Sequence, residues 1–268
     1  MAKAKAKLNI TTPHDTEHAN AIIYGASGAG KTRLLGTAVD CEQTSPALLL
    51  DFESGTRTLR GVKIDVIRPQ SWREIQDIYD FFIHDNKKYQ SVLLDSVTEI
   101  QKKYSLGVIM DEMGGDELSH ADLGKNEAPN RKDWNRTNLQ MSKLIRSFRD
   151  LAYNPKQDCR VHVFFSALES YREKKDLMCP TLSGALGEDC GAMVDFLFRL
   201  SRQNIVKENK DGEEVKILKR FLLTDSHINE DGILYMGKNR GKGMPKGIWE
   251  PTMSKLIECI QNEGGGEK

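Results

Sequence analysis

The sequence predicts an α/β fold, with a mostly parallel sheet flanked by helices and an antiparallel β extension towards the C-terminus. Two observations lead to this prediction. Short, nearly continuous apolar runs alternate with helical stretches over the first part of the chain, as in parallel strands covered on both faces. After about residue 190, two extended segments flank the turn-forming sequence Glu208–Gly212, which predicts a hairpin.

The expected elements follow in chain order. Five apolar strands come first, at Ala21–Tyr24, Ala47–Phe52, Val62–Ile67, Ser91–Asp95 and Arg160–Ala167. The helices expected between them are Ser71–His84, Ser96–Met113 and Trp134–Tyr153. The hairpin strands are Val194–Ser201 and Ile217–Thr224, followed by a strand at Gly232–Met236 and a helix at Ser254–Gln261. We expect one domain over residues 19–262, with a flexible or extended arm over 1–18 and a disordered tail over 263–268.

Composition excludes several classes of protein. The chain has 268 residues, of which 29% are charged and 38% hydrophobic, and its net charge is zero. These values fit a globular domain and give no sign of a wholesale nucleic-acid binder. The five cysteines form no C-x-x-C pair, which argues against a zinc site or a disulfide framework and favours a cytoplasmic location. We expect no membrane partner, because no apolar run approaches the length of a membrane span.

A phosphate-binding loop is the most specific motif in the chain. Its eight residues match G-x-x-x-x-G-K-[ST] and are Gly25, Ala26, Ser27, Gly28, Ala29, Gly30, Lys31 and Thr32. The loop follows an apolar strand and opens a helix, so backbone N–H groups can surround a polyphosphate. Lys31 is expected to reach the β- and γ-phosphates, and the Thr32 hydroxyl to bind Mg²⁺. The expected cofactors are therefore ATP and Mg²⁺.

Two carboxylates at strand ends complete the predicted site. Asp95 closes the strand Ser91–Asp95 and is expected to hold the Mg²⁺ hydration shell; the alternative is a helix N-cap. Ser96 follows it, where AAA-type ATPases usually place a catalytic Glu, so we expect the base elsewhere. Glu53 follows the second strand and can orient the attacking water. Asp51 is the alternative base, and a solvated loop position is the alternative for Glu53.

These motifs together resemble a known group of proteins. The segment Asp51-Phe-Glu53 after the phosphate loop and the strand ending Asp95-Ser96 resemble the RecA-type P-loop NTPase core. A closer resemblance is to phage-encoded RecA-fold nucleotide-binding proteins, which include the fourth Sak family of single-strand annealing recombinases, and it covers about Ala21 to Pro251. The resemblance implies ATP hydrolysis, single-stranded DNA binding and strand annealing in phage recombination. It also implies a homo-oligomer, ring or filament, and a single-stranded DNA-binding protein as a further partner.

The resemblance assigns roles to three more residues. The segment Met236–Lys246 carries four cations and no acid, and its Lys238 and Arg240 match an element that RecA-fold helicases offer to the γ-phosphate of a neighbouring subunit. This would place a catalytic site between subunits. The alternatives are a flexible basic loop or a DNA contact. Ser166 occupies the place of the residue that senses the γ-phosphate.

Two loops are expected to face DNA in this fold. The first, Gly114–Asp133, is net acidic, which is unfavourable for binding phosphates. The second, Leu168–Asp189, contains an aromatic residue beside cations that can stack a base and contact phosphates. Its candidate DNA-binding residues are Tyr171, Arg172, Lys174 and Lys175. The alternative functions are a helicase-like motor, a regulator or loader acting on a replication protein, and a small-molecule kinase.

Overall fold

The computed structural model describes residues 18–110, 129–208 and 214–261. The strands are β1 (Asn20–Gly25), β2 (Ala47–Asp51), β3 (Asp65–Ile67), β4 (Ser91–Asp95), β5 (His162–Arg172), β6 (Leu177–Pro180), β7 (Phe196–Glu208), β8 (Glu214–Leu223), β9 (His227–Ile228), β10 (Leu234–Tyr235) and β11 (Gly247–Trp249). The α-helices are α1 (Lys31–Gly36), α2 (Trp72–His84), α3 (Val97–Glu99), α4 (Leu106–Met110), α5 (Arg131–Asp150), α6 (Leu186–Met193) and α7 (Met253–Gln261). A π-helical turn, Ile100–Ser105, joins α3 to α4.

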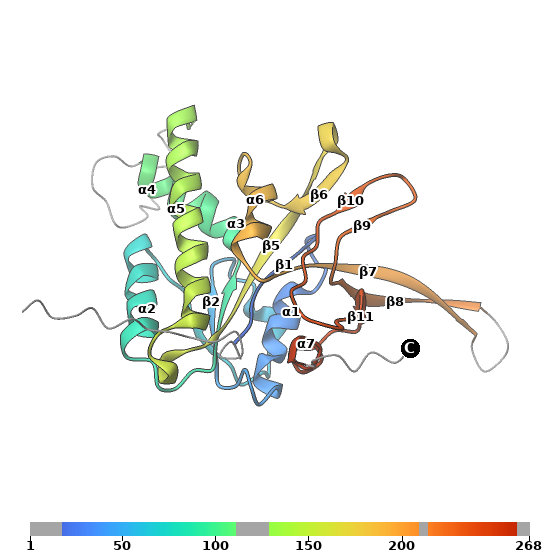
Figure 1. Ribbon diagram of the computed structural model, residues 1–268, viewed down its shortest axis with the longest axis horizontal. Helices are drawn as coiled ribbons and strands as arrows, with labels where there is room; N and C mark the ends of the chain where they lie inside the picture. The colour runs from blue at the N-terminus through green and yellow to red at the C-terminus, as the bar shows by residue number, and fades with distance from the viewer. Residues whose placement is uncertain (1–17, 111–128, 209–213, 262–268) are drawn as a thin grey trace, which may run out of the picture.

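One sheet contains all of these strands, and helices cover both of its faces (Figure 1). Its main path runs in the order β11-β8-β7-β1-β5-β4-β2-β3. The strands from β7 to β3 pair in parallel, whereas β8 and β11 are antiparallel additions at one edge. The predicted fold class, a mostly parallel α/β sheet flanked by helices with an antiparallel C-terminal extension, is confirmed.

Two hydrophobic clusters explain why the strands read as continuous apolar runs. Successive strand side chains point to opposite faces, so Ile22 and Tyr24 of β1 join one cluster while Ala21 and Ile23 join the other. The first cluster packs against α2, α5 and α6, and the second packs against α1 and α7. Both faces of β1, β2, β4 and the first half of β5 are therefore buried. Because these strands run parallel, their carboxyl ends lie at one edge of the sheet, where the site is.

Several boundaries differ from the sequence prediction. β5 continues to Arg172 instead of ending near Ala167, and α5 begins at Arg131 inside the expected first DNA loop. The second expected loop is wrong: its residues form the end of β5, strand β6 and helix α6. The C-terminal end of β5 is polar and has no apolar strand pattern in its sequence. It is a strand because it pairs with β6 in antiparallel orientation. Most of the first expected loop lies outside the described residues, as do the N-terminal arm before His18 and the C-terminal tail.

The N-terminal end of β5 carries a buried histidine. His162 accepts a hydrogen bond on Nδ1 from the Ala19 backbone N–H at 3.0 Å. Burial lowers the pKa of His162 to about 3, because the charged imidazolium is poorly solvated there. Below about pH 6.5 the imidazole of His162 is therefore protonated in the unfolded chain, whereas in the folded chain it stays neutral down to about pH 3.

The expected consequence is a loss of stability in acid. The free energy of unfolding should be about 2 kcal/mol lower at pH 5 than at pH 7 through this residue alone. His162→Asn, which keeps an acceptor for Ala19 but does not titrate, should flatten that part of the pH profile. Urea unfolding at both pH values measures the difference, with the exposed His227→Asn as the matched control. An unchanged profile in His162→Asn would contradict the assignment.

Candidate nucleotide-binding site

The phosphate-binding loop lies between β1 and α1 and depends on glycine at two points. Gly30 caps α1 with φ of 101°, a left-handed conformation that residues with a Cβ adopt at a cost. A Cβ on Gly25 would lie 2.1 Å from the carbonyl oxygen of Leu200 in β7, so only glycine permits this close approach. The loop therefore has its shape both from its own sequence and from the strand beside it.

Lys31 points back into the loop. Its ammonium donates hydrogen bonds to the carbonyl oxygens of Gly25 at 2.9 Å and Ala26 at 3.0 Å, and the residue is buried. Burial lowers the pKa of Lys31, while the nearby Glu53 and Asp95 carboxylates oppose that shift. The ammonium is thus held where the loop backbone turns.

A hydroxyl–carboxylate cluster joins the loop to β4. Thr32 Oγ1 donates to Asp95 Oδ2 at 2.5 Å, and the buried Ser166 hydroxyl donates to Asp95 Oδ1. This is possible because β5 lies between β1 and β4. Burial raises the pKa of Asp95, and the two hydroxyls oppose the shift. A buried carboxylate beside a threonine hydroxyl, both oxygen donors, is a suitable donor set for Mg²⁺.

Glu53 and Asp51 have different surroundings. Glu53 accepts a hydrogen bond from the Ser96 hydroxyl and lines a cavity of about 570 Å³ that also contains Lys31 and Thr32. Asp51 accepts from the Gly55 backbone N–H at 3.0 Å and pairs with Arg68 at 3.1 Å. The Asp51 carboxylate is therefore committed to holding the loop after β2, whereas Glu53 faces the cavity.

The sequence matches a family model described as an AAA domain over residues 17–240. The chain belongs to this AAA domain family. The match includes the phosphate-binding loop, Glu53, Asp95 and Ser166, so the described site lies within the matched residues. Membership supports an ATPase with a P-loop core.

Solved structures also resemble this AAA domain. RadB recombinase is 13% identical with a TM-score of 0.37, and the match covers 81% of this chain and 90% of that chain. An ATPase from the type III secretion system of pathogenic bacteria is 18% identical with a TM-score of 0.42, covering 69% of this chain and 52% of that chain. No curated protein matches the sequence. Because one fold serves many functions, the role of the AAA domain is argued from its site.

The AAA domain keeps Lys238 and Arg240 away from its own cavity. Lys238 donates to the carbonyl oxygens of Gly191 at 2.9 Å and Val194 at 2.5 Å, where a cation caps the C-terminal end of α6. Arg240 pairs with Asp195 at 2.5 Å and its side chain is 61% exposed. Neither residue lines the cavity with the phosphate-binding loop. The ammonium of Lys238 is thus engaged within its own chain, and a role in a neighbouring site stays a prediction.

The predicted DNA-binding residues lie at the tip of the hairpin that β5 forms with β6 (Figure 1). Tyr171 is exposed and donates to Asp176 Oδ1 at 2.6 Å. Arg172 turns inward and donates to the carbonyl oxygen of Leu182 at 2.8 Å, and Lys175 pairs with Glu188 at 2.5 Å. Lys174 is exposed in the short 3₁₀ turn between the strands. The structure therefore leaves Tyr171 and Lys174 outermost, while Arg172 supports the hairpin.

Sequence reasoning missed three contributions to the site. The sequence predicts no role for Ser96, although its hydroxyl donates a hydrogen bond to Glu53. Glu169 of β5 pairs with Arg199 of β7 at 2.9 Å, and Arg202 of β7 lines the cavity. No local motif marks these residues, because β5 and β7 reach the loop only through sheet pairing. A sequence prediction would place Arg199 and Arg202 beside the loop only if it first predicted that β7 pairs with β1.

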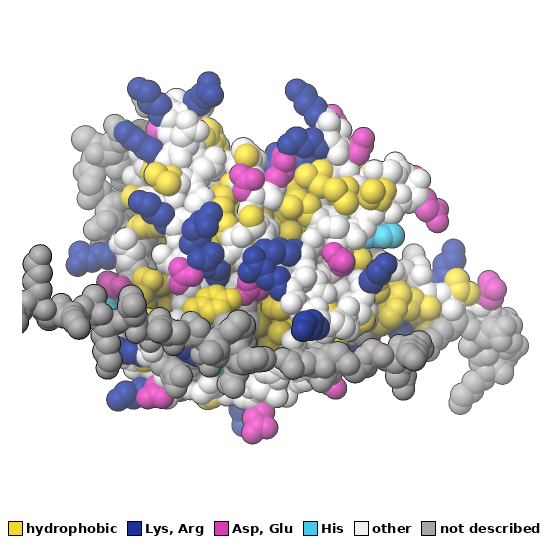
Figure 2. All heavy atoms as spheres, viewed as in Figure 1, with side chains coloured by type: hydrophobic (Ala, Val, Ile, Leu, Met, Phe, Trp, Pro, Cys, Tyr) yellow, Lys and Arg dark blue, Asp and Glu magenta, His cyan; other side chains and the backbone are white. Residues whose placement is uncertain are grey.

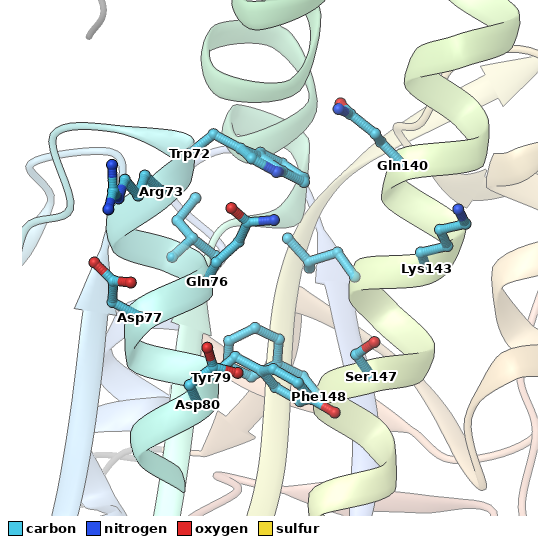
Figure 3. A pocket seen from close by; sticks show the side chains of 12 residues that line it. Trp72, Arg73, Gln76, Asp77, Tyr79, Asp80, Gln140, Lys143, Ser147 and Phe148 are labelled. Carbon is cyan, nitrogen blue, oxygen red and sulfur yellow. The ribbon is translucent and has the colours of Figure 1, made fainter. Parts of the chain in front are cut away.

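A larger cavity lies elsewhere in the AAA domain. It measures about 790 Å³ and opens between α2 and α5. Figure 3 shows Trp72 and Gln140 at one end, Tyr79 and Phe148 at the other, and Lys143 across from Gln76. None of the phosphate-loop residues or the strand-end carboxylates lines it. Size alone does not make it the site, because the convergent polar groups are at the smaller cavity.

Proposed function

We propose that this protein is a Mg²⁺-dependent ATPase in which Glu53 orients the attacking water. One observation carries the proposal: Glu53, Lys31 and Thr32 line a single cavity, and Thr32 is bonded to Asp95. A carboxylate facing the γ-phosphate position can accept hydrogen bonds from water and direct it for in-line attack. The Ser96 hydroxyl holds one Glu53 oxygen, which leaves the other free for that water.

The remaining residues of the cavity bind and polarise the substrate. The loop N–H groups from Ser27 to Thr32 would surround the phosphates, and Lys31 would exchange its two carbonyl partners for phosphate oxygens. Thr32 and Asp95 would hold Mg²⁺, which when bound neutralises charge on the phosphate oxygens. The Ser166 hydroxyl fixes Asp95, so its contribution is to position the carboxylate from β5.

We further propose that the ATPase acts on single-stranded DNA in recombination and promotes strand annealing. The resemblance noted above is the main support, and the position of the β5–β6 hairpin adds to it. Leu168 of β5 lines the nucleotide cavity, and Tyr171 lies three residues further along the same strand. A change at the phosphates can therefore reach the hairpin tip through one short rigid segment. Exposed Tyr171 would stack a base, and Lys174 would contact phosphate.

The surface charge fits weak or local DNA contact. Figure 2 shows Lys and Arg side chains spread over this face among acidic and apolar ones, without a single broad basic patch. The affinity for DNA would then depend on a few stacking and phosphate contacts per subunit, and an oligomer would bind more tightly because several subunits contact the same strand. We propose a homo-oligomer for this reason, with the exposed Arg240 reaching a neighbour. Its ion pair with Asp195 is exposed on the arginine side, so exchanging it costs little.

The test is ATP hydrolysis measured with and without single-stranded DNA, with Lys31→Ala as the blank. We expect DNA-stimulated turnover that the blank lacks, and annealing of complementary strands by the wild type. The double variant Tyr171→Ala with Lys174→Ala should weaken DNA binding at least tenfold, because base stacking alone contributes about 1–3 kcal/mol. Lys87→Ala, an exposed lysine elsewhere, is the charge control.

Two results would count against the DNA proposal. Turnover indifferent to DNA, together with no DNA binding at low salt, would favour a regulator of a protein partner or a small-molecule kinase. Directional unwinding of duplex DNA would favour a helicase-like motor over annealing. If the hairpin variant and the wild type bound DNA equally well, the protein would still be a DNA-binding protein, but the hairpin would not be the binding site.

A further inference from the structure

Strand β7 runs directly beside the phosphate-binding loop. Tyr24 of β1 is paired with Arg199 of β7, and the next β7 residue, Leu200, almost touches Gly25. Two residues further on, Arg202 lines the same cavity as Ser27, Gly28 and Lys31. Arg202 is exposed and has no ion-pair partner among the described residues. The strand thus delivers an arginine to the loop that is not neutralised within the described chain.

A second arginine lies opposite the first. Arg202 of β7 and Arg220 of β8 are directly paired across the antiparallel ladder, so their side chains leave the same face of the sheet about 5 Å apart at Cβ. Arg220 packs against the loop: a Cβ on Gly30 would lie 3.2 Å from Arg220 Cδ. Two like charges facing one another across strands are unfavourable unless an anion joins them.

Glu250 neutralises only part of this pair. Its carboxylate accepts from Arg220 Nη2 at 3.2 Å and from the Arg220 backbone N–H at 2.7 Å. Glu250 adopts a positive φ of 45° to do so, a strained conformation for a residue with a side chain. Arg220 Nη1 is left buried without a hydrogen-bond partner in the described structure. Glu250 therefore fixes Arg220 against Gly30, and no described residue forms an ion pair with Arg202.

We infer that Arg202 binds the terminal phosphate of ATP within its own subunit, and that Arg220 is a positioning residue that supports Gly30 and keeps Arg202 over the loop. A guanidinium matches two phosphate oxygens at once, and this contact needs no residue from a neighbouring subunit. This inference rests on the proposed ATPase function and adds a specificity determinant: Arg202 distinguishes a triphosphate from a diphosphate.

The test compares ATP and ADP affinity by calorimetry with Mg²⁺ present. Arg202→Ala should weaken ATP binding about ten- to a hundredfold, the range for a hydrogen bond to a charged group, and change ADP binding less than threefold. Arg202→Lys should recover part of the loss. The matched control is Lys219→Ala, which removes one cation from β8 but lies opposite Gln203 on the other face of the strand pair. Arg220→Met should reduce the ATP-to-ADP affinity ratio by a smaller factor, with Arg220→Lys partly restoring it.

A second measurement decides whether Arg202 acts in its own subunit. Mixed assemblies of Arg202→Ala and Glu53→Gln chains should recover no turnover, because every site then lacks one of the two groups. Recovered turnover, or equal losses for ATP and ADP, would overturn the inference while wild-type ATPase activity stands. Wild-type protein that fails to bind ATP would overturn the proposed function and the inference with it.

Discussion

Glu53→Gln is expected to lower ATP turnover by about a hundred- to ten-thousandfold while ATP stays bound. The loss is that of a positioned general base. An amide of the same shape still fits beside Ser96 but cannot accept a proton from water. Single-turnover hydrolysis and calorimetric ATP binding on one preparation separate the two effects.

The neighbouring carboxylate is the informative control for this variant. Asp51→Asn removes the ion pair with Arg68 and weakens the acceptor for Gly55, so we expect lower stability with most turnover retained. Glu42→Gln, on an exposed residue, should change neither. A greater loss of turnover in Asp51→Asn than in Glu53→Gln would indicate that Asp51, and not Glu53, is the general base.

The Glu53→Gln variant also tests whether neighbouring subunits share an active site. If Arg240 reaches a neighbouring site, mixing Arg240→Ala chains with Glu53→Gln chains should restore turnover at some interfaces, since one site then receives both intact groups. This outcome is opposite to that expected for Arg202. A mixture no more active than its components would remove the predicted role of Arg240 between subunits.

Lys31→Ala is expected to abolish measurable ATP binding. The ammonium lies buried among the loop carbonyls of Gly25 and Ala26, so its loss removes both the cation for the phosphates and two hydrogen bonds that hold the loop. Hydrogen bonds from charged groups contribute about 1.5–3 kcal/mol each, and several are lost together.

Calorimetry with ATP and Mg²⁺ measures the effect, and thermal unfolding without nucleotide reports whether the fold survives. Lys31→Met keeps the apolar stem and serves as a second variant should the alanine protein prove unstable. Lys63→Ala, an exposed lysine, should bind ATP normally. Retained binding by a folded Lys31 variant would remove the nucleotide site from this loop.

The parts of the site that sequence predicted are local ones. The phosphate-binding loop needs only its own glycines, a strand before it and a helix after it, and all three are contiguous in the chain. Asp95 and Glu53 were found because parallel strands end at one edge of the sheet, so polar residues just after apolar runs converge. The confirmed fold class followed from the same alternation of strands and helices.

The parts that sequence missed depend on which strands become neighbours. Lys238 matches a motif spacing, yet its ammonium caps α6. The polar end of β5 lacks a strand pattern, yet pairing with β6 makes it one. At the end of β5 a contact with a distant segment overrides what the local residues indicate, whereas the role of Lys238 in a neighbouring site stays a prediction.

The phosphate-binding loop and the strand-end carboxylates can be predicted from sequence, because backbone geometry and strand alternation are encoded within a few residues. The order of the strands in the sheet places β5 between β1 and β4, so that Ser166 holds Asp95, and it places β7 beside the loop, so that Arg202 lines the same cavity as Lys31. Those positions arise from strand order, which is set by packing over the whole sheet.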